Sequence, residues 1–241
     1  QRSHTLMLYL QFTMLILLPP SEGKNSVQKG KPVSLTSLSF GKDLNLTRKK
    51  TLAAMGTKIA KGPSAKAIDV YSGVLYQALD YQNLNTAAKK RAEKSIVIIS
   101  ALFGALKLTD SIPTYKLDMA ISLPKLGSLN ALWKPVVTKA LESIKTDLII
   151  DCRSSTYQGV WTPDLKKTVG IRVFAEKNGK RSVVTHMSKK TRGDVAKFLV
   201  MQSKSPKTAQ ELQKLVAKEF KCELVKPEGK KSWFLDVIVK N

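Results

Sequence analysis

The sequence has few of the residues that build metal centres or disulfide-stapled folds. Its 241 residues include two cysteines, Cys152 and Cys222, without CxxC spacing, and two histidines, His4 and His186. Structural zinc sites and disulfide frameworks need several closely spaced ligands, so we expect neither, and no cofactor. Cys152 ends an apolar run, which favours a small buried residue; the alternative is a thiol activated by the neighbouring Arg153.

Long apolar segments are also missing. No run after residue 20 is long enough to cross a membrane, and no basic helix has an aromatic face typical of membrane-surface binding, so we expect no membrane partner. Residues 1–13 lack a signal-peptide cleavage site and look like a protease-cleavable tag linker, so we interpret Met14 as the native start. Residues 14–241 are then expected to form a single domain.

Acidic residues are scarce. Eighteen Asp and Glu face 41 Lys and Arg, which gives a formal net charge of +23 and a pI near 10.0. Such a chain attracts polyanions, and nucleic acid is the first partner to consider. The alternative is lysine spread evenly for solubility.

Short apolar runs alternate with helical patterns along the chain, and an Asn-Gly pair within residues 176–180 predicts a β-hairpin. Residues 25–43 are rich in Ser, Gly and Lys and predict a long surface loop. The expected strands are 14–18, 95–100, 147–151, 169–175, 181–187 and 233–239. The expected helices are 46–60, 68–81, 86–94, 129–144 and 208–220. This alternation predicts a mixed α/β fold, with a mixed central sheet and flanking helices in one compact domain.

Residues 183–199, VVTHMSKKTRGDVAKFL, read as a strand, a basic turn and a helix opening near Gly193. Lys189, Lys190 and Arg192 would then lie where the unpaired N–H groups of the helix point, and Gly193 would let the backbone approach a ligand. This arrangement predicts an anion site. The alternative is a solvated charge run on a turn.

Five segments together resemble one family. They are MLILLPPSEGK at 14–24, DVYSGVLYQALD at 69–80, SALFGALKLTDSIPTYKL at 100–117, DCRSSTY at 151–157 and MSKKTRG at 187–193. In this order they resemble the motifs of the YaaA peroxide-stress family, most closely its actinobacterial branch. The resemblance implies a cytoplasmic protein with the compact α/β fold of that family. It also implies binding of double-stranded DNA through a basic cleft and a helix-hairpin-helix-like element, linked to limiting peroxide damage. We expect a monomer.

Two stretches are candidates for the helix-hairpin-helix-like element, in which a glycine turn lets backbone N–H groups grip a phosphate. The preferred one runs from Met55-Gly56 to Lys61-Gly62, with a further helix near Ser64; the other is Phe103-Gly104-Ala105. Ordinary helix-capping glycines are the alternative in both cases. The candidate DNA-binding residues are Lys24, Arg48, Lys49, Lys58, Lys61, Arg153, Lys189, Lys190, Arg192 and Gly193.

The same motifs allow an enzyme as the alternative function. Ligands bind at strand ends in α/β sheets, and polar clusters follow three predicted strands. They are Ser21, Glu22 and Lys24, then Arg153, Ser154 and Tyr157, then Lys189, Lys190 and Arg192. If these ends converge, Glu22 is a candidate base, Lys24 or Lys190 would stabilise developing negative charge, and Arg153 would clamp an oxyanion on a small anionic substrate. Otherwise Ser21-Glu22 caps a turn and Arg153 pairs with Asp151 or Glu22. No residue set names a reaction, so we favour a binding protein.

Overall fold

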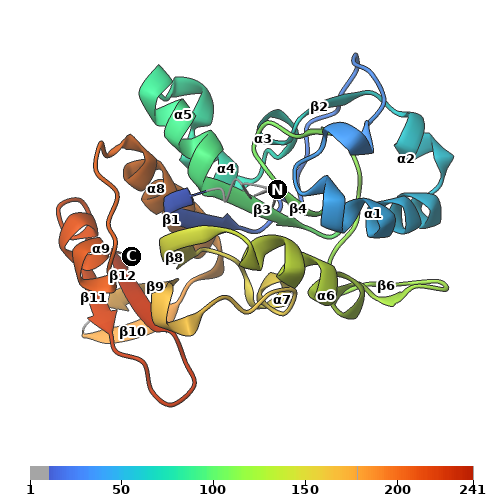
Figure 1. The fold of residues 1–241 in the computed structure, drawn as a ribbon. Helices are drawn as coiled ribbons and strands as arrows, with labels where there is room; N and C mark the ends of the chain where they lie inside the picture. Colours follow the sequence, from blue (N-terminus) through green and yellow to red (C-terminus); the bar gives the residue numbers. More distant parts are fainter. Residues whose placement is uncertain (1–10, 178, 241) are drawn as a thin grey trace, which may run out of the picture.

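The central element is strand β1 (Gln11–Leu18) of one mixed sheet, in a computed structural model that describes residues 11–177 and 179–240. β1 lies between β3 (Ile96–Ser100) and β8 (Lys145–Asp151) and is parallel to both. The sheet order is β11-β12-β9-β8-β1-β3-β4, and β10 pairs with β9. The expected mixed α/β fold and compact single domain are confirmed (Figure 1).

The remaining sheet strands are β4 (Gly104–Leu106), β9 (Thr168–Lys177), β10 (Lys180–Val183), β11 (Cys222–Val225) and β12 (Trp233–Lys240). Two small sheets form from β2 (Ser64–Lys66) with β5 (Ser111–Pro113), and from β6 (Ser122–Leu123) with β7 (Gly127–Ser128). The helices are α1 (Gly41–Met55), α2 (Thr57–Lys61), α3 (Ala67–Val70), α4 (Val74–Leu79), α5 (Thr86–Ser95), α6 (Leu129–Glu142), α7 (Ser155–Gln158), α8 (Thr185–Met201) and α9 (Ala209–Val216). Short 3-10 helices are η1 (Leu35–Ser37), η2 (Tyr81–Asn83) and η3 (Leu165–Lys167).

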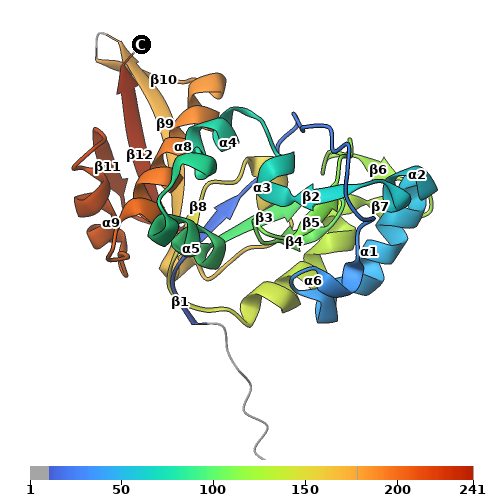
Figure 2. The ribbon, with the colours of Figure 1, turned by 90° about the horizontal axis from the view of Figure 1, so that it is seen from above.

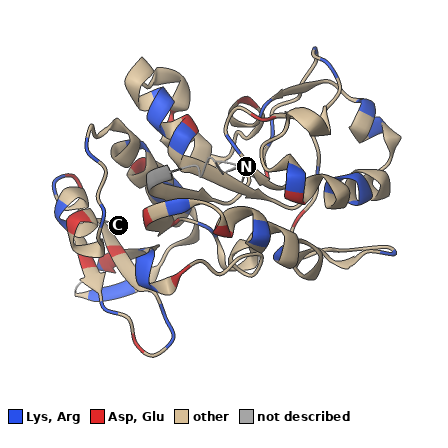
Figure 3. Cartoon of the chain, in the orientation of Figure 1, with Lys and Arg blue, Asp and Glu red and all other residues tan. Residues whose placement is uncertain are grey.

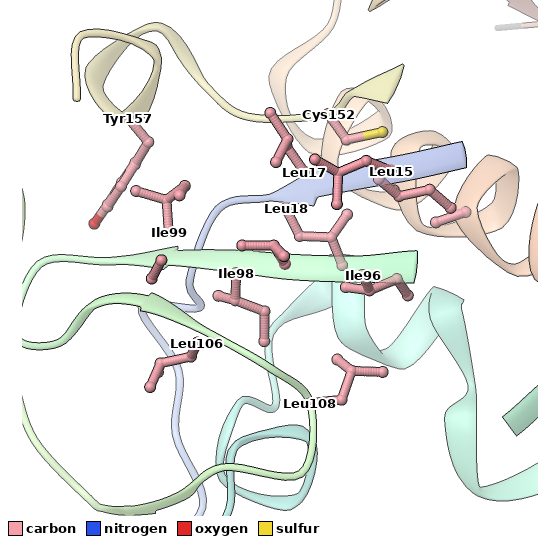
Figure 4. Packing of buried hydrophobic residues seen from close by; sticks show 14 of the residues in the cluster. Leu15, Leu17, Leu18, Ile96, Ile98, Ile99, Leu106, Leu108, Cys152 and Tyr157 are labelled. Carbon is pink, nitrogen blue, oxygen red and sulfur yellow. The ribbon is translucent and has the colours of Figure 1, made fainter. Parts of the chain in front are cut away.

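The core is built on strands that are covered on both faces. Residues 15–18 of β1 and 96–99 of β3 are all fully buried. Figure 4 shows the Leu15 and Leu17 side chains of β1 close to those of β3 and to Cys152. Continuous apolar runs are typical of parallel strands covered by helices on both sides, which is why these two segments were readable from the sequence.

The helices divide between the two faces of the sheet. Figure 1 shows α4, α5 and α8 on one side and α6 and α7 on the other. The chain therefore leaves the adjacent strands β1 and β8 toward opposite faces. In α/β sheets such a point opens a crevice outside the carboxyl ends of the two strands, where ligands bind.

The sequence interpretation of residues 181–199 was wrong about the elements. Strand β10 ends at Val183, and α8 already begins at Thr185, so Lys189, Lys190 and Arg192 lie within a helix and not in a turn before it. Gly193 does not open α8. A Cβ atom there would lie 2.2 Å from the Leu75 carbonyl oxygen, so the glycine permits close packing of α8 on α4.

Other boundaries also differ. The helix expected over 68–81 is divided into α3, α4 and η2, and the helix expected near Ser64 is strand β2. The loop expected over 25–43 contains η1 and the start of α1. Of the interpreted linker, residues 1–10 lie outside the described residues, whereas residues 11–13 belong to β1 and pair with β8. The hairpin between β9 and β10 is confirmed.

Candidate functional site

A cavity of about 680 Å³ lies at the carboxyl ends of β1 and β8, where the crevice is expected. It brings together all three predicted polar clusters, since Ser21 and Glu22, Arg153, Ser154 and Tyr157, and Lys189 and Arg192 line it. Two residues of these three clusters, Lys24 and Lys190, are not part of the lining. Lining residues that the sequence analysis did not single out include Asp118, Arg172, Thr185, Ser188 and Phe234.

Ser21 joins the end of β1 to the start of α4. The Ser21 hydroxyl, which is buried, accepts a hydrogen bond of 2.7 Å from the backbone N–H of Gly73. A Cβ atom on Gly73 would lie 2.2 Å from this hydroxyl oxygen. The Tyr76 hydroxyl donates to the Pro19 carbonyl, at 2.7 Å. Ser21 thus holds α4 against the strand end, a structural role that differs from the turn cap considered as the alternative.

Arg153 is buried and largely occupied. Its guanidinium donates to both carboxylate oxygens of Asp151, at 2.9 and 2.8 Å, and to the Tyr157 carbonyl at 3.2 Å. This bidentate pair neutralises the charge within the loop after β8. Arg153 therefore shapes the cavity wall, and its pairing with Asp151 is the structural alternative of the sequence analysis.

One face of α8 supplies the polar wall. Thr185, Ser188, Lys189 and Arg192 have the spacing of neighbours on one helix surface, and all four line the cavity. Lys189 is half-exposed and lies 3.7 Å from the Glu22 carboxylate, which is 84% exposed at the rim. Lys190, outside the lining, pairs with Asp194 at 2.8 Å.

Lys24 lies just behind the cavity. Its Nζ atom donates to the Ser21 carbonyl at 2.6 Å and lies 4.5 Å from the centre of the Tyr115 ring. Burial lowers the pKa of Lys24 to about 8, against the raising effect of Glu22 and Asp118. The Tyr115 hydroxyl is hydrogen-bonded to Tyr71 and Ser100.

Cys152 and Tyr157 are not activated groups. Cys152 is fully buried, and burial raises the pKa of its thiol to about 12 despite the nearby Arg192. Burial likewise raises the pKa of the Tyr157 phenol. The interpretation of Cys152 as a small core residue is confirmed, and neither group is suited to act as an anionic nucleophile at neutral pH.

The second group of predicted residues lies in residues 29–66, which we call the basic lobe. The lobe contains nine Lys or Arg and one acidic residue, Asp43. Asp43 pairs with Lys139 of α6 at 3.1 Å. Figures 2 and 3 show the lobe, with α1 and α2, on the opposite side of the molecule from α8 and α9 and bearing several of the basic residues.

Arg48 is the one cation of the basic lobe that lies in the core. It is fully buried and donates to the carbonyls of Phe103 (2.9 Å), Ala105 (2.7 Å) and Ser39 (2.8 Å), and to the Asn45 side chain. It ties α1 to the turn between β3 and β4. Arg48 therefore cannot contact DNA from this position.

Eight lysines of the basic lobe are exposed, and within the described part of the chain none has an ion pair or hydrogen bond through its ammonium group. They are Lys29, Lys31, Lys42, Lys49, Lys50, Lys58, Lys61 and Lys66. Lys49, Lys58 and Lys61, predicted as DNA contacts, are thus free to meet a partner.

The preferred glycine turn lacks the flanking helices that were expected, one over 46–60 and one beginning near Ser64. α1 ends at Met55, Gly56 follows with φ of +90°, and α2 ends at Lys61 before β2. Gly104 is the first residue of β4, directly after the turn from β3, and a Cβ there would lie 2.6 Å from the Trp133 ring. The first stretch therefore has a glycine between α1 and the short α2, followed by a strand, and the second leads from a β-turn into a strand packed on Trp133.

No helix of the described residues is long and apolar enough to cross a membrane. In the same part of the chain, no cluster of three or more His, Cys, Asp and Glu side chains is placed to hold a metal ion.

The sequence of the chain matches a family of known proteins. A model of the family "Peroxide stress protein YaaA" matches residues 14–224. The chain belongs to the YaaA family. A UPF0246 protein of Streptomyces coelicolor is 33% identical over 94% of this chain and 98% of its own length. Another from Corynebacterium glutamicum is 34% identical over 84% and 91%, and one from Shewanella denitrificans is 31% identical over 76% and 74%.

The family result confirms the resemblance, including its actinobacterial relatives, and links the chain to peroxide stress. Four of the five segments that carried the resemblance contribute lining residues to the cavity: Glu22 from the first, Tyr76 from the second, Arg153 from the fourth and Lys189 from the fifth. Asp118 lies one residue beyond the third segment. The sequence motifs of this YaaA-family chain therefore gather around one place in the fold.

Proposed function

We propose that this YaaA-family protein binds double-stranded DNA in the cytoplasm, as a monomer, through phosphate contacts made by the basic lobe. The proposal rests on eight exposed lysines that have no ion pair with any described residue, beside one aspartate that is already paired with Lys139. Lysines free of carboxylates can exchange counterions for DNA phosphates, and the release of counterions drives sequence-independent binding.

The local geometry supports phosphate contacts over base reading. Lysine is a flexible point charge and lacks the planar fork with which arginine reads guanine. Lys49 and Lys50 lie on α1, and Lys58 and Lys61 lie on α2, with Gly56 between the helices. Phosphate contacts of this kind position a protein on a duplex without selecting its sequence. The family link to peroxide stress fits a role at DNA, which oxidants damage.

A pair of charge-matched variants tests the proposal. In the first, four lysines of the basic lobe become glutamine: Lys49→Gln, Lys50→Gln, Lys58→Gln and Lys61→Gln. In the second, four exposed lysines of the C-terminal part change in the same way: Lys204→Gln, Lys218→Gln, Lys226→Gln and Lys230→Gln. Both variants lose four charges, so they differ in the position of the charge and not in its amount.

Fluorescence anisotropy with two unrelated 20-base-pair duplexes, across a salt series, gives the readout. We expect the lobe variant to lose about tenfold or more in affinity for both duplexes, and the slope of log K against log salt to fall by up to about 3.6, since each lost phosphate contact removes about 0.9. The C-terminal variant should stay close to the unmodified protein. Equal losses in both variants would show general charge attraction without a DNA surface on the lobe.

A further inference from the structure

In the part of the chain that the structure describes, one arginine of the cavity at the ends of β1 and β8 has no ion pair. Four basic residues line the cavity. Arg153 is neutralised by Asp151, and Arg172 donates to both oxygens of Asp236, at 2.6 and 2.7 Å. Lys189 lies near Glu22. Arg192 remains.

Arg192 uses only part of its guanidinium. Its Nε atom donates to the Ile171 carbonyl at 3.2 Å, which fixes the side chain against β9. The two terminal nitrogens make no hydrogen bond or ion pair with the residues that the structure describes. Arg192 is half-buried and is part of the cavity lining, so its side chain is partly shielded from water. A guanidinium that is fixed through Nε and has both terminal nitrogens available is suited to bind a phosphate or carboxylate through two hydrogen bonds.

Neighbouring groups on α8 favour the same kind of ligand. Thr185 lines the cavity from the first turn of α8, and no side chain caps the helix start. The unpaired N–H groups of a first turn add partial positive charge. Lys189 lies one turn of helix before Arg192 and its pairing with Glu22 is loose and solvent-exposed. The α8 wall therefore carries two cations, Lys189 and Arg192, while the carboxylates of Glu22 and Asp118 line other parts of the cavity.

The rest of the lining is mixed, and an apolar part lies beside polar residues that include Asp118, Ser154 and Gln158. Val74 and Leu75 of α4, Ile171 of β9 and Phe234 of β12 line the cavity, and Val183 of β10, 74% exposed, lies at its edge. A volume of about 680 Å³ lies within the range of small-molecule sites, which combine apolar walls with a few placed polar groups. A bare inorganic ion would leave these walls unused.

We propose that the cavity binds a small organic oxyanion, a phosphate monoester or a carboxylate with an apolar body, and that Arg192 anchors its charged group. The apolar body lies against Ile171, Leu75 and Phe234. This site is separate from the basic lobe proposed to bind DNA, and each can fail without the other.

The test compares two substitutions on one helix. Arg192→Gln removes the anchor, whereas Lys190→Gln removes an equal charge two residues earlier, at a side chain that pairs with Asp194 outside the cavity lining. Full-length protein labelled with ¹⁵N is titrated with phenyl phosphate, benzoate, phenol and inorganic phosphate. Amide shifts are followed by NMR, and the spectrum of each variant shows whether it is folded.

We expect saturable shifts at the start of α8 and at residues 170–172 with phenyl phosphate, benzoate or both, which distinguishes the phosphate and carboxylate arms. Phenol, lacking charge, and inorganic phosphate, lacking an apolar body, should bind at least fivefold more weakly. Arg192→Gln should lower the affinity at least tenfold, Arg192→Lys by less, and Lys190→Gln less than twofold. The absence of a saturable shift at the cavity overturns the proposal. Equal loss of affinity in both glutamine variants also overturns it, because it would mean that the anion binds by general charge attraction, as an adventitious ion only.

Discussion

The basic lobe and the cavity use positive charge in opposite ways. In the lobe, eight lysines are exposed and have no ion pair among the residues described, and one arginine is buried in the core. In the cavity, two arginines are bound to carboxylates by bidentate pairs and one, Arg192, keeps open donors. The net charge of +23 therefore does not locate a partner by itself. The pairing of each cation separates a diffuse polyanion surface from a site for one small anion.

The largest expected effect is on stability, and it separates the buried cation of the lobe, Arg48, from the exposed lysines. Arg48→Met should lower the free energy of unfolding by about 3 to 5 kcal/mol, because three carbonyls lose the buried guanidinium that binds them. Lys49→Met, at the next residue but exposed, should change it by less than about 0.5 kcal/mol. Urea denaturation of both variants gives the comparison.

A similar small loss in both variants would mean that Arg48 is replaceable, and the distinction between the two kinds of lobe cation would be lost. Duplex binding by the folded fraction adds a second readout. Arg48→Met should leave it unchanged when measured at low temperature, since the side chain has no exposed surface.

Unlike the lobe, the cavity has a wall formed by two tightly packed helices, α4 and α8. Gly193→Val should destabilise the protein by about 2 to 3 kcal/mol, since the new side chain would overlap the Leu75 carbonyl and push α8 from α4. Lys190→Val is the control on the exposed surface of the same helix, and helix propensity limits its cost to roughly 0.5 kcal/mol. Thermal unfolding measures both. If the two variants unfold at the same temperature, α8 can shift without cost and the cavity wall is not rigid.

Sequence reasoning succeeded where the signal was local. The buried runs at 14–18 and 96–100 and the Asn-Gly hairpin were readable because continuous apolar runs and turn chemistry act over a few residues. It failed at 185–193, where Val183-Val184-Thr185 suggested a continuing strand and Gly193 suggested a turn. Gly193 is required by Leu75, which is 118 residues away in the chain, and no local pattern encodes such a contact.

The candidate site shows the same limit. The three polar clusters were placed together because carboxyl ends of parallel strands share an edge. Arg48 looked like a DNA contact because its partners, the carbonyls of Phe103 and Ala105, are more than 50 residues away in the chain. The pairing of Arg153 with the nearby Asp151 was one of the alternatives that the sequence left open. Arg172 and Phe234 were missed because they lie within strands, where nothing in the sequence distinguishes a lining residue from a core residue.

A smaller effect tests the environment behind the cavity. Lys24 has a folded pKa of about 8, below the value near 10.4 of an unfolded lysine, so between these pH values the unfolded chain binds more protons. The contribution of Lys24 to stability should therefore rise as pH increases through this interval. Relative to Lys24→Met, the unmodified protein should gain stability from pH 7.5 to pH 9.5 in urea denaturation. A difference that stays constant over this interval would contradict a lowered pKa of the Lys24 amine in the folded protein.

The smallest expected effect decides whether the two regions are separate. The sequence hypothesis gave Lys189, Lys190 and Arg192 one common role in gripping DNA, but the fold turns Lys189 and Arg192 into the cavity and pairs Lys190 with Asp194. Replacing all three with alanine should weaken duplex binding by no more than about threefold, through the loss of long-range attraction, equally for unrelated sequences. Anisotropy at the same salt concentrations as for the lobe variant measures this. A loss as large as that of the lobe variant, with a matching fall in salt slope, would extend the DNA surface across α8 and make the cavity part of it.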